Sequence, residues 1–241
     1  MPPNSRTPVW KSIALALTDD IARGRYQTGS KLPSEAQLSA QFGVNRHTVR
    51  RALGDLADQG LVHARRGAGV FVAAAPTDYP IGKRVRFRKS LRAAGREPSG
   101  KLLAITSRGA DAKEAEALDL AIGDLIYASD GLSFADGQPV TVAQSCFPAA
   151  RFQGFEEVHR KTQSVTETFA HFGIADYTRA WTRLTAVAAS ATQALHLMLP
   201  EGAPLLRSVS VNVDADGVPI EYGTTYFAGP RITLTLAAED V

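Results

Sequence analysis

The chain has little of what several classes of protein depend on. It holds a single cysteine, Cys146, among 241 residues, so no disulfide can form within the chain. No apolar run approaches the roughly 18 residues that cross a membrane, and nothing in residues 1–4 resembles a secretion signal. We therefore expect a cytoplasmic protein with no membrane partner.

Sequence patterns of catalysis and metal binding are also missing. No nucleophile motif, glycine-rich phosphate loop or pair of catalytic carboxylates stands out. His159, His171 and His196 are far apart in the sequence, and the His-x-x-His spacing of a metal site is absent. We expect neither an enzyme nor a metal site, and no cofactor.

Charge is distributed unevenly along the chain. Residues 1–100 contain 17 Lys and Arg against 7 Asp and Glu, whereas residues 101–241 contain 10 against 17. A basic segment attracts a polyanion by counterion release, and an acidic segment does not. Because 44% of the residues are hydrophobic, a chain of this length can supply two cores. These features favour two domains with different partners.

Residues 33–53 have the pattern of two short helices around a tight turn. Ser34 is expected to cap the first helix, with Gln37 completing a capping box, and Gly43 to end that helix in the left-handed conformation. Asn45 then caps the second helix. The apolar residues that recur there at the spacing of one buried helix face are Val49, Leu53 and Leu56.

The opposite face of the second helix is basic, with Arg46, His47, Arg50 and Arg51. Guanidinium groups on such a helix can bond guanine in the major groove of DNA, and Thr48, in the first turn, is placed to meet a phosphate. A row of charges is also the ordinary composition of a solvated helix face. The helix alone therefore leaves both interpretations open.

The residues after the second helix favour DNA binding. Residues 61–65 and 70–72 are expected to form a β-hairpin around the turn at residues 67–69. Arg65 and Arg66 lie at the approach to its tip, where a hairpin beside a reading helix can reach a minor groove or the DNA backbone. An apolar stripe upstream predicts a helix that completes the core, with Trp10, Ile13, Leu17 and Ile21. We predict a winged helix-turn-helix.

The residues from Trp10 to Val72, including LPSEAQLSAQFGVNRHTVRRALGDLADQGLVHARRGAGVFV, resemble the N-terminal domain of GntR-type bacterial repressors. The resemblance implies DNA contacts at Arg46, Thr48, Arg50, Arg66 and Gly67. One position departs, because Ala36 stands where many relatives have an arginine. The full set of candidate DNA contacts is Ser34, Arg46, His47, Thr48, Arg50, Arg51, Arg65, Arg66 and Gly67.

Small residues and two prolines after the hairpin predict an extended connection. We place a DNA-binding domain at residues 1–75, a linker at 76–82 and a second domain at 83–241. The second domain contains an internal repeat, because residues 111–147 and 190–227 each show a helix, a glycine corner, a strand, an Asp-Gly turn and a strand. Two copies predict two α-plus-hairpin halves that meet in one mainly antiparallel sheet, and so an α+β chain.

Motifs that carry a second resemblance run through nearly the whole chain: NRHTVRRAL, DYPIGKRVRFRKSLRAAGREP, ADYTRAWTRLTA and IEYGTTYFAG. They are similar to the HutC subfamily of GntR regulators, whose second domain is the UTRA effector domain, a fold related to chorismate lyase. Within the subfamily the resemblance is closest to phosphonate-operon repressors of the PhnF type. It implies a domain that binds a small effector and joins two copies of the chain.

UTRA domains that bind phosphorylated sugars hold the phosphate with two arginines before the first hairpin turn, and with a serine and a tyrosine that open the central helix. The corresponding positions here are Gly131, Ser133, Ser164 and Thr166, so only the helix serine is kept. A buried dianion needs charge-assisted donors to offset its desolvation. The loss of both arginines argues against that phosphate-sugar geometry.

Other arginines are available as donors. Arg84 and Arg86 are expected to alternate on one strand face, and Arg179 and Arg183 on another, which they share with Tyr177 and Trp181. A surface or salt-bridged position is the alternative for each of these arginines.

Glu221 and Tyr226 are further candidates, because a carboxylate can pair with the amino group of an aminoalkylphosphonate. The complete set of candidate effector-binding residues is Arg84, Arg86, Ser133, Ser164, Thr166, Arg179, Arg183, Glu221 and Tyr226.

Together these patterns predict a homodimeric repressor. Two winged domains would bind the half-sites of a near-palindromic operator in double-stranded DNA. A small anionic or zwitterionic effector, a phosphonate by resemblance, would control that binding. The alternatives are a HutC-type regulator that answers to a different metabolite and a ligand-independent DNA-binding protein.

Overall fold

The computed structural model of the chain describes residues 7–65, 67–73, 76–84 and 86–236. Contacts divide the chain into two units, residues 1–75 and 76–241. Among the described residues, no helix is long and apolar enough to cross a membrane.

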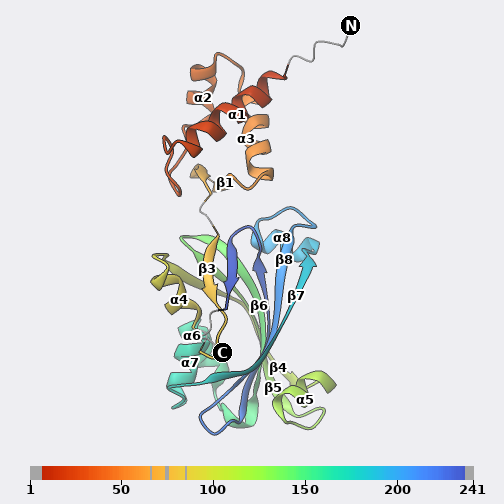
Figure 1. The fold of residues 1–241 in the computed structure, drawn as a ribbon. Helices are drawn as coiled ribbons and strands as arrows, with labels where there is room; N and C mark the ends of the chain where they lie inside the picture. Colours follow the sequence, from red (N-terminus) through yellow and green to blue (C-terminus); the bar gives the residue numbers. More distant parts are fainter. Residues whose placement is uncertain (1–6, 66, 74–75, 85, 237–241) are drawn as a thin grey trace. The chain divides into compact units, whose positions relative to one another are not determined.

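The first unit is the predicted winged helix-turn-helix (Figure 1). Its elements are α1 Val9–Ala22, α2 Glu35–Phe42, α3 Arg46–Asp58, β1 Val62–Arg65 and β2 Gly69–Val72. The Ser34 side chain and Gln37 form the capping box at the start of α2, and Gly43 ends that helix at a φ of 64°. The strands β1 and β2 pair antiparallel as a hairpin, with Val62 opposite Val72.

One apolar core holds the helices of the first unit together. Its residues with no exposed surface include Leu17 of α1, Leu38 of α2, and Val49 and Leu56 of α3. Full burial of each such side chain stabilises the fold by about 1.5–3 kcal/mol relative to exposure. The core therefore fixes which side of α3 faces outward.

The second unit is built on a six-stranded antiparallel sheet of order β4-β5-β6-β9-β8-β7. The strands are β4 Pro98–Gly109, β5 Leu125–Ala135, β6 Gln138–Pro148, β7 Thr178–Ala188, β8 Pro204–Val213 and β9 Pro219–Ala228. The helices are α4 Phe87–Ala93, α5 Ala112–Leu118, the 3-10 helix η1 Ala149–Arg151, α6 Phe155–Thr162, α7 Val165–His171 and α8 Ala191–Leu197.

The predicted repeat appears as two related halves of this sheet. One half is β4, α5, β5 and β6, and the other is β7, α8, β8 and β9, and they meet where β6 pairs with β9. Gly123 and Gly202 adopt φ values of 91° and 80° at the two corners. At the first hairpin turn, Asp136 and Gly137 have φ values of 49° and 75°.

Helices cover both faces of the sheet. Helices α4, α6 and α7 lie on one side and α5 on the other (Figure 1). On the first face, Phe147 of β6 packs against Phe155 of α6 and Phe169 of α7. On the opposite face, α5 packs near Ile126, and α8 packs near Leu205. The aromatic cluster occupies only part of the first face, and the remainder adjoins a cavity.

Residues 77–80 were expected to be part of an extended linker, but they belong to a sheet. They form strand β3 (Thr77–Pro80), which pairs in parallel with β10 (Ile232–Thr235) inside the second unit. Tyr79 is 3% exposed, and its ring centroid lies 5.4 Å from that of Phe227. The partner strand lies near the end of the chain, so local composition does not indicate the pairing.

Candidate functional site

Helix α3 presents a basic face to solvent. Asn45 caps the helix by accepting a hydrogen bond from the Thr48 backbone N–H at 2.9 Å. The residues that bury its apolar side are Val49, Ala52, Leu53 and Leu56. The basic residues of the helix, all of them exposed, are Arg46, His47, Arg50 and Arg51. This is the arrangement expected of a helix that enters a major groove.

Two of these basic side chains have protein partners. Arg50 donates from Nε and Nη2 to the carboxylate oxygens of Glu35, at 3.0 and 2.8 Å. The hydrogen bond from Arg50 holds the pKa of Glu35 below its usual range. The guanidinium of Arg51 lies 4.6 Å from the ring centroid of Trp10. Both guanidinium groups are therefore positioned by α1 and α2.

Ser34 and Thr48 are engaged in helix capping. The Ser34 Oγ accepts from the Gln37 backbone N–H at 3.3 Å and donates to the Gln37 side chain at 2.8 Å. The Thr48 hydroxyl donates to the Asn45 side-chain oxygen at 3.0 Å. Both hydroxyl protons are committed, so the oxygens of Ser34 and Thr48 keep only acceptor capacity.

The hairpin places the remaining DNA candidates at its tip. Arg65 ends β1 opposite Gly69, and Gly67 has a φ of 75° in the turn. Only glycine adopts such a φ at little cost, which explains the residue type at position 67. Arg66 lies outside the described residues.

The second unit contains a cavity of about 940 Å³ between the sheet and helices α4, α6 and α7. Its floor is the sheet face on which every second residue is small. On the neighbouring strands β5 and β6 these residues are Ser129, Gly131, Ser133, Thr141, Ala143 and Ser145. Small side chains leave room above the strands, and the volume is typical of small-molecule sites, about 300–1,000 Å³.

Arg84 and Arg86 line this cavity, but neither lies on a strand, so the predicted strand alternation is wrong. Arg84 lies in a bend, and Arg86 directly precedes α4. Both reach Asp176, at 2.8 Å from Arg84 Nη2 and 3.0 Å from Arg86 Nη2. Arg86 also stacks on Tyr177, with its guanidinium carbon 3.5 Å from the ring centroid. A shared carboxylate, and not strand alternation, brings the two arginines together.

Arg179 lines the cavity, whereas Arg183 does not. A β-bulge interrupts β7 between Arg179 and Trp181, so Arg179 pairs with Asn212 and Trp181 with its neighbour Val211. The extra residue turns Trp181 and Arg183 to the opposite face, where the Arg183 guanidinium carbon lies 4.7 Å from the Trp181 ring centroid. The expected alternation of four residues on one face therefore fails at the bulge.

Arg179 is partly exposed, and its polar atoms are incompletely satisfied. Its Nη1 donates to the Thr182 hydroxyl at 3.3 Å, while its buried Nε has no hydrogen-bond partner among the described residues. A buried donor without a partner costs free energy. An anion in the cavity would supply the missing acceptor.

The other effector candidates divide between the two faces. Ser133, Ser164, Thr166 and Glu221 line the cavity. Ser164 caps α7 through the Glu167 backbone N–H at 3.3 Å, and the Thr166 hydroxyl lies 2.8 Å from the Tyr177 hydroxyl. Tyr226 alternates with the cavity-facing residues of β9 and packs beside α8 on the opposite face.

Sequence reasoning missed several polar residues of the cavity, among them Ser129, Ser145, His159 and Asn212. His159 is 5% exposed, and burial lowers its pKa to about 4, so the ring is neutral near neutral pH. In the sequence, His159 is a solitary histidine without the spacing of a metal site, and no group of three or more metal-binding side chains occurs within the described part of the chain. The signal that could have found this floor is the alternation of small hydroxyl residues on two consecutive predicted strands.

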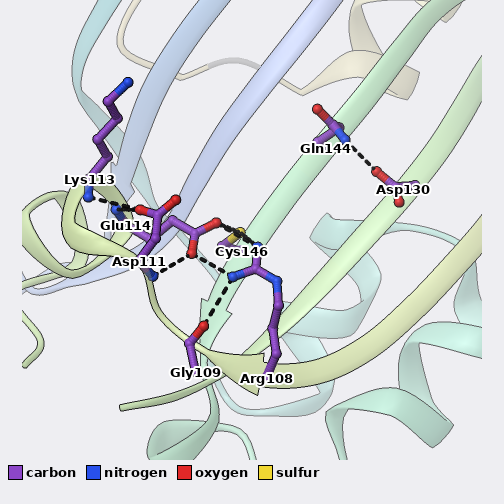
Figure 2. Close-up of polar contacts among 8 residues, drawn as sticks. All are labelled: Arg108, Gly109, Asp111, Lys113, Glu114, Asp130, Gln144 and Cys146. Atoms are coloured by element: carbon purple, nitrogen blue, oxygen red, sulfur yellow. Dashed lines mark hydrogen bonds and ion pairs between the residues drawn. The ribbon is translucent and has the colours of Figure 1, made fainter. Parts of the chain in front are cut away.

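A separate polar cluster lies on the opposite sheet face beside α5 (Figure 2). Arg108 donates to both carboxylate oxygens of Glu114 at 2.6 Å, and the Cys146 thiol donates to Glu114 at 3.2 Å. Hydrogen bonding to Arg108 lowers the pKa of Glu114 to about 2, and burial raises the pKa of Cys146 to about 12. The cysteine is therefore a protonated structural residue at neutral pH.

Comparisons with known proteins agree with this architecture. Residues 10–72 match the family model for bacterial regulatory proteins of the gntR family, and residues 93–233 match the UTRA domain. An uncharacterised HTH-type transcriptional regulator of Rhizobium meliloti (strain 1021) is 38% identical over 95% of this chain and 94% of its own length. The probable transcriptional regulator PhnF of Escherichia coli (strain K12) is 31% identical over 97% of both chains.

A solved structure extends the match to three dimensions. The crystal structure of PhnF from Mycobacterium smegmatis superposes with a TM-score of 0.66 at 26% identity, covering 93% of this chain and 98% of that one. The winged helix-turn-helix, the UTRA sheet and these relatives lead to one assignment. The chain belongs to the GntR family, with a UTRA domain of the HutC and PhnF type, and is a non-enzymatic, DNA-binding transcriptional regulator.

Proposed function

We propose that this regulator is a homodimeric repressor whose operator affinity is controlled by a small anionic or zwitterionic effector bound in the cavity of the second unit. One observation carries the proposal. The cavity of about 940 Å³ has Arg86 and Arg179 in its wall, and the buried Nε of Arg179 has no acceptor among the described residues. An anionic ligand satisfies that donor by a charge-assisted hydrogen bond.

Direct base readout is proposed for the exposed face of α3. Arg46 and Arg50 can bond guanine edges, and His47 and Arg51 flank them on the same helix. Ser34, Thr48 and the wing-tip residues Arg65, Arg66 and Gly67 are proposed to meet the sugar-phosphate backbone, which positions the helix without reading sequence. To donate to a phosphate oxygen, the hydroxyls of Ser34 and Thr48 must turn away from their capping partners Gln37 and Asn45 when DNA binds.

The proposed effector contacts are the candidates that the cavity brings together. They are Arg84, Arg86, Ser133, Ser164, Thr166, Arg179 and Glu221. Arg183 and Tyr226 are left out, because the bulge in β7 and the pleat of β9 direct them to the other sheet face.

A two-fold dimer explains how one small winged unit selects an operator. Two copies read the two halves of a near-palindrome, which doubles the number of base contacts. The cytoplasm is the proposed location, since operator DNA lies there. An effector that weakens operator binding must, by linkage, bind less tightly to the DNA-bound form.

Phosphonate uptake or catabolism genes are the proposed targets. The support is the 31% identity to the probable regulator PhnF of Escherichia coli (strain K12). The test has two steps: selection of a preferred site from random DNA, followed by a thermal-shift panel of phosphonates, phosphate esters and imidazole acids. A true effector raises the melting temperature by mass action. A shift by an imidazole acid alone would identify a different metabolite, and no shift at all would favour ligand-independent DNA binding.

A further inference from the structure

Polar side chains gather on the cavity floor at adjoining positions of β5, β6, β9 and β8. Ser129 lies opposite Ser145, Ser145 opposite Gly223, and Asn212 opposite Glu221 in the strand register. All five residues line the cavity. Their hydrogen bonds determine which atoms can still donate and which can only accept.

The carboxylate of Glu221 is 8% exposed, and both of its oxygens accept hydrogen bonds. Oε1 accepts from the Ser145 hydroxyl at 2.7 Å, and Oε2 accepts from the Asn212 side-chain amide at 2.6 Å. Buried carboxylates are usually paired with a cation, yet none of the described basic residues forms an ion pair with Glu221. Each oxygen keeps a further lone pair for a ligand.

The two partners of Glu221 also present acceptors. Ser145 has one hydroxyl proton and gives it to Glu221, so only its lone pairs remain. Asn212 uses its amide nitrogen toward Glu221, and its Oδ1 is buried without a hydrogen-bond partner in the described part of the chain. A buried acceptor with no donor costs free energy. Both residues therefore favour a ligand that donates.

A hydrogen bond to His159 leaves the Ser129 hydroxyl able only to accept from a ligand. The Thr168 hydroxyl lies 2.8 Å from both the Ser164 carbonyl and the Thr162 hydroxyl. If it gives its one proton to either oxygen, it accepts from Nδ1–H of His159, 3.0 Å away. In the neutral ring, Nε2 then carries no proton and accepts from the Ser129 hydroxyl at 3.2 Å. This chain of bonds uses the only proton of Ser129, and lone pairs are left for the cavity.

Gly223 keeps the space beside these acceptors open. A Cβ at this position would lie 3.4 Å from Ser145 Oγ and 3.6 Å from Glu221 Oε1. The backbone there is one that any residue adopts, so an alanine would fill the space without straining the chain.

We propose that Glu221, Ser145, Asn212 and Ser129 form a cradle that binds an ammonium group of the effector. A primary ammonium supplies three N–H donors and the positive charge that the buried carboxylate lacks. The inference rests on the proposed effector cavity and narrows its ligand to a zwitterion. The anionic end faces Arg179, which pairs with Asn212 on the adjacent strand.

The test uses matched pairs of probes in which a methyl group replaces the ammonium. The pairs are 2-aminoethylphosphonate with propylphosphonate, taurine with propanesulfonate, and β-alanine with butyrate. Calorimetric titration of the full chain with each compound compares affinities at a constant anion. We expect the ammonium member of at least one pair to bind ten times or more tightly than its methyl partner.

Two substitutions test whether the preference for the ammonium compound arises at the cradle. Glu221→Gln removes the charge and should abolish the difference within the pair, leaving the weaker affinity of the methyl compound. Gly223→Ala fills the space without changing charge and should have the same effect if Glu221→Gln fails to fold. Asp130→Asn is the matched control, because Asp130 accepts from the Gln144 amide at 2.9 Å on the opposite sheet face (Figure 2). It should keep the full preference.

The possible results distinguish failure of the ammonium cradle from failure of the effector cavity. Equal binding of both members of every pair, or a preference that survives Glu221→Gln and Gly223→Ala, would overturn the cradle and leave an anion-binding cavity. Absence of binding by all six compounds would also overturn the cradle. The effector cavity itself would be overturned only if the phosphate esters and imidazole acids of the thermal-shift panel gave no shift either.

Discussion

Arg50 of α3 and Glu35 of α2 form a two-pronged ion pair across the helix-turn-helix, with nitrogen–oxygen distances of 3.0 and 2.8 Å. The pair holds the guanidinium of Arg50 in one orientation on the exposed face. An arginine that is already positioned loses less side-chain entropy when it binds a base. We therefore expect Glu35 to contribute to DNA binding without being part of the basic face.

Loss of Arg50 should weaken operator binding. Arg50→Ala and Arg46→Ala are each expected to cost about 1–3 kcal/mol and to relax preference at one or two base pairs. Glu35→Gln keeps Arg50 but weakens the two contacts that hold its guanidinium. It should lower the ratio of operator to non-operator affinity. Thr48→Ala should weaken binding to all sequences similarly. Fluorescence anisotropy with operator and mutated duplexes measures these effects, and unchanged operator affinity in both arginine variants would refute the assignment of the reading helix.

Salt should weaken the complex steeply, because cationic side chains that meet phosphates release counterions. If Arg66 neutralises one phosphate, Arg66→Ala should make the slope of log affinity against log salt shallower by up to about one unit. The same anisotropy titration at several salt concentrations gives the slope. A complex insensitive to salt would contradict a basic wing and helix on DNA.

The caps, the hairpin and the repeat could be predicted because each has a local cause. Ser34, Gly43 and Asn45 act within a few residues of where they stand, and their geometry depends on residue type. The helix–strand–turn–strand pattern likewise repeats at both halves of the sheet.

The cavity wall could be predicted only in part, because it depends on contacts distant in sequence. Alternation places Arg179 on the same sheet face as Tyr177, but a single inserted residue in β7 turns Arg183 to the opposite face. Arg84 and Arg86 converge because Asp176 lies between them in space, and β3 exists because β10 pairs with it. None of these partners has a local signature.

Arg179 and Arg183 provide a matched pair of variants for the cavity. Arg179→Ala should abolish the thermal stabilisation given by an anionic effector, because the anion loses a charge-assisted donor. Arg183→Ala, on the opposite face, should leave it intact. Neither should alter operator affinity in the absence of ligand. Equal loss of the thermal shift in both variants would mean that the ligand binds elsewhere.

His159 should make stability depend on pH. Its folded pKa of about 4 lies below the ordinary 6.5, so the unfolded chain binds the proton more readily between these values. Above about pH 6.5 the ring is neutral in both states, and the free energy of unfolding is not reduced by His159. As the pH falls from 6.5 toward 4, protonation of the unfolded chain lowers that free energy. Between pH 7 and 4, the unfolding free energy should fall by about 3 kcal/mol more in the wild type than in His159→Gln. Urea unfolding at both pH values gives this difference, and parallel pH dependence would contradict a neutral buried ring.

The coupling of the cavity to DNA is the central claim. Its most direct measurement is the dissociation constant of the full chain for its selected operator, with and without saturating 2-aminoethylphosphonate, in the wild type and in Arg179→Ala. Coupling between two sites commonly amounts to about 5- to 150-fold in affinity. The account predicts that the ligand weakens operator binding by a factor in this range in the wild type and has no effect in Arg179→Ala. A wild-type affinity unchanged by a ligand that demonstrably binds would contradict it.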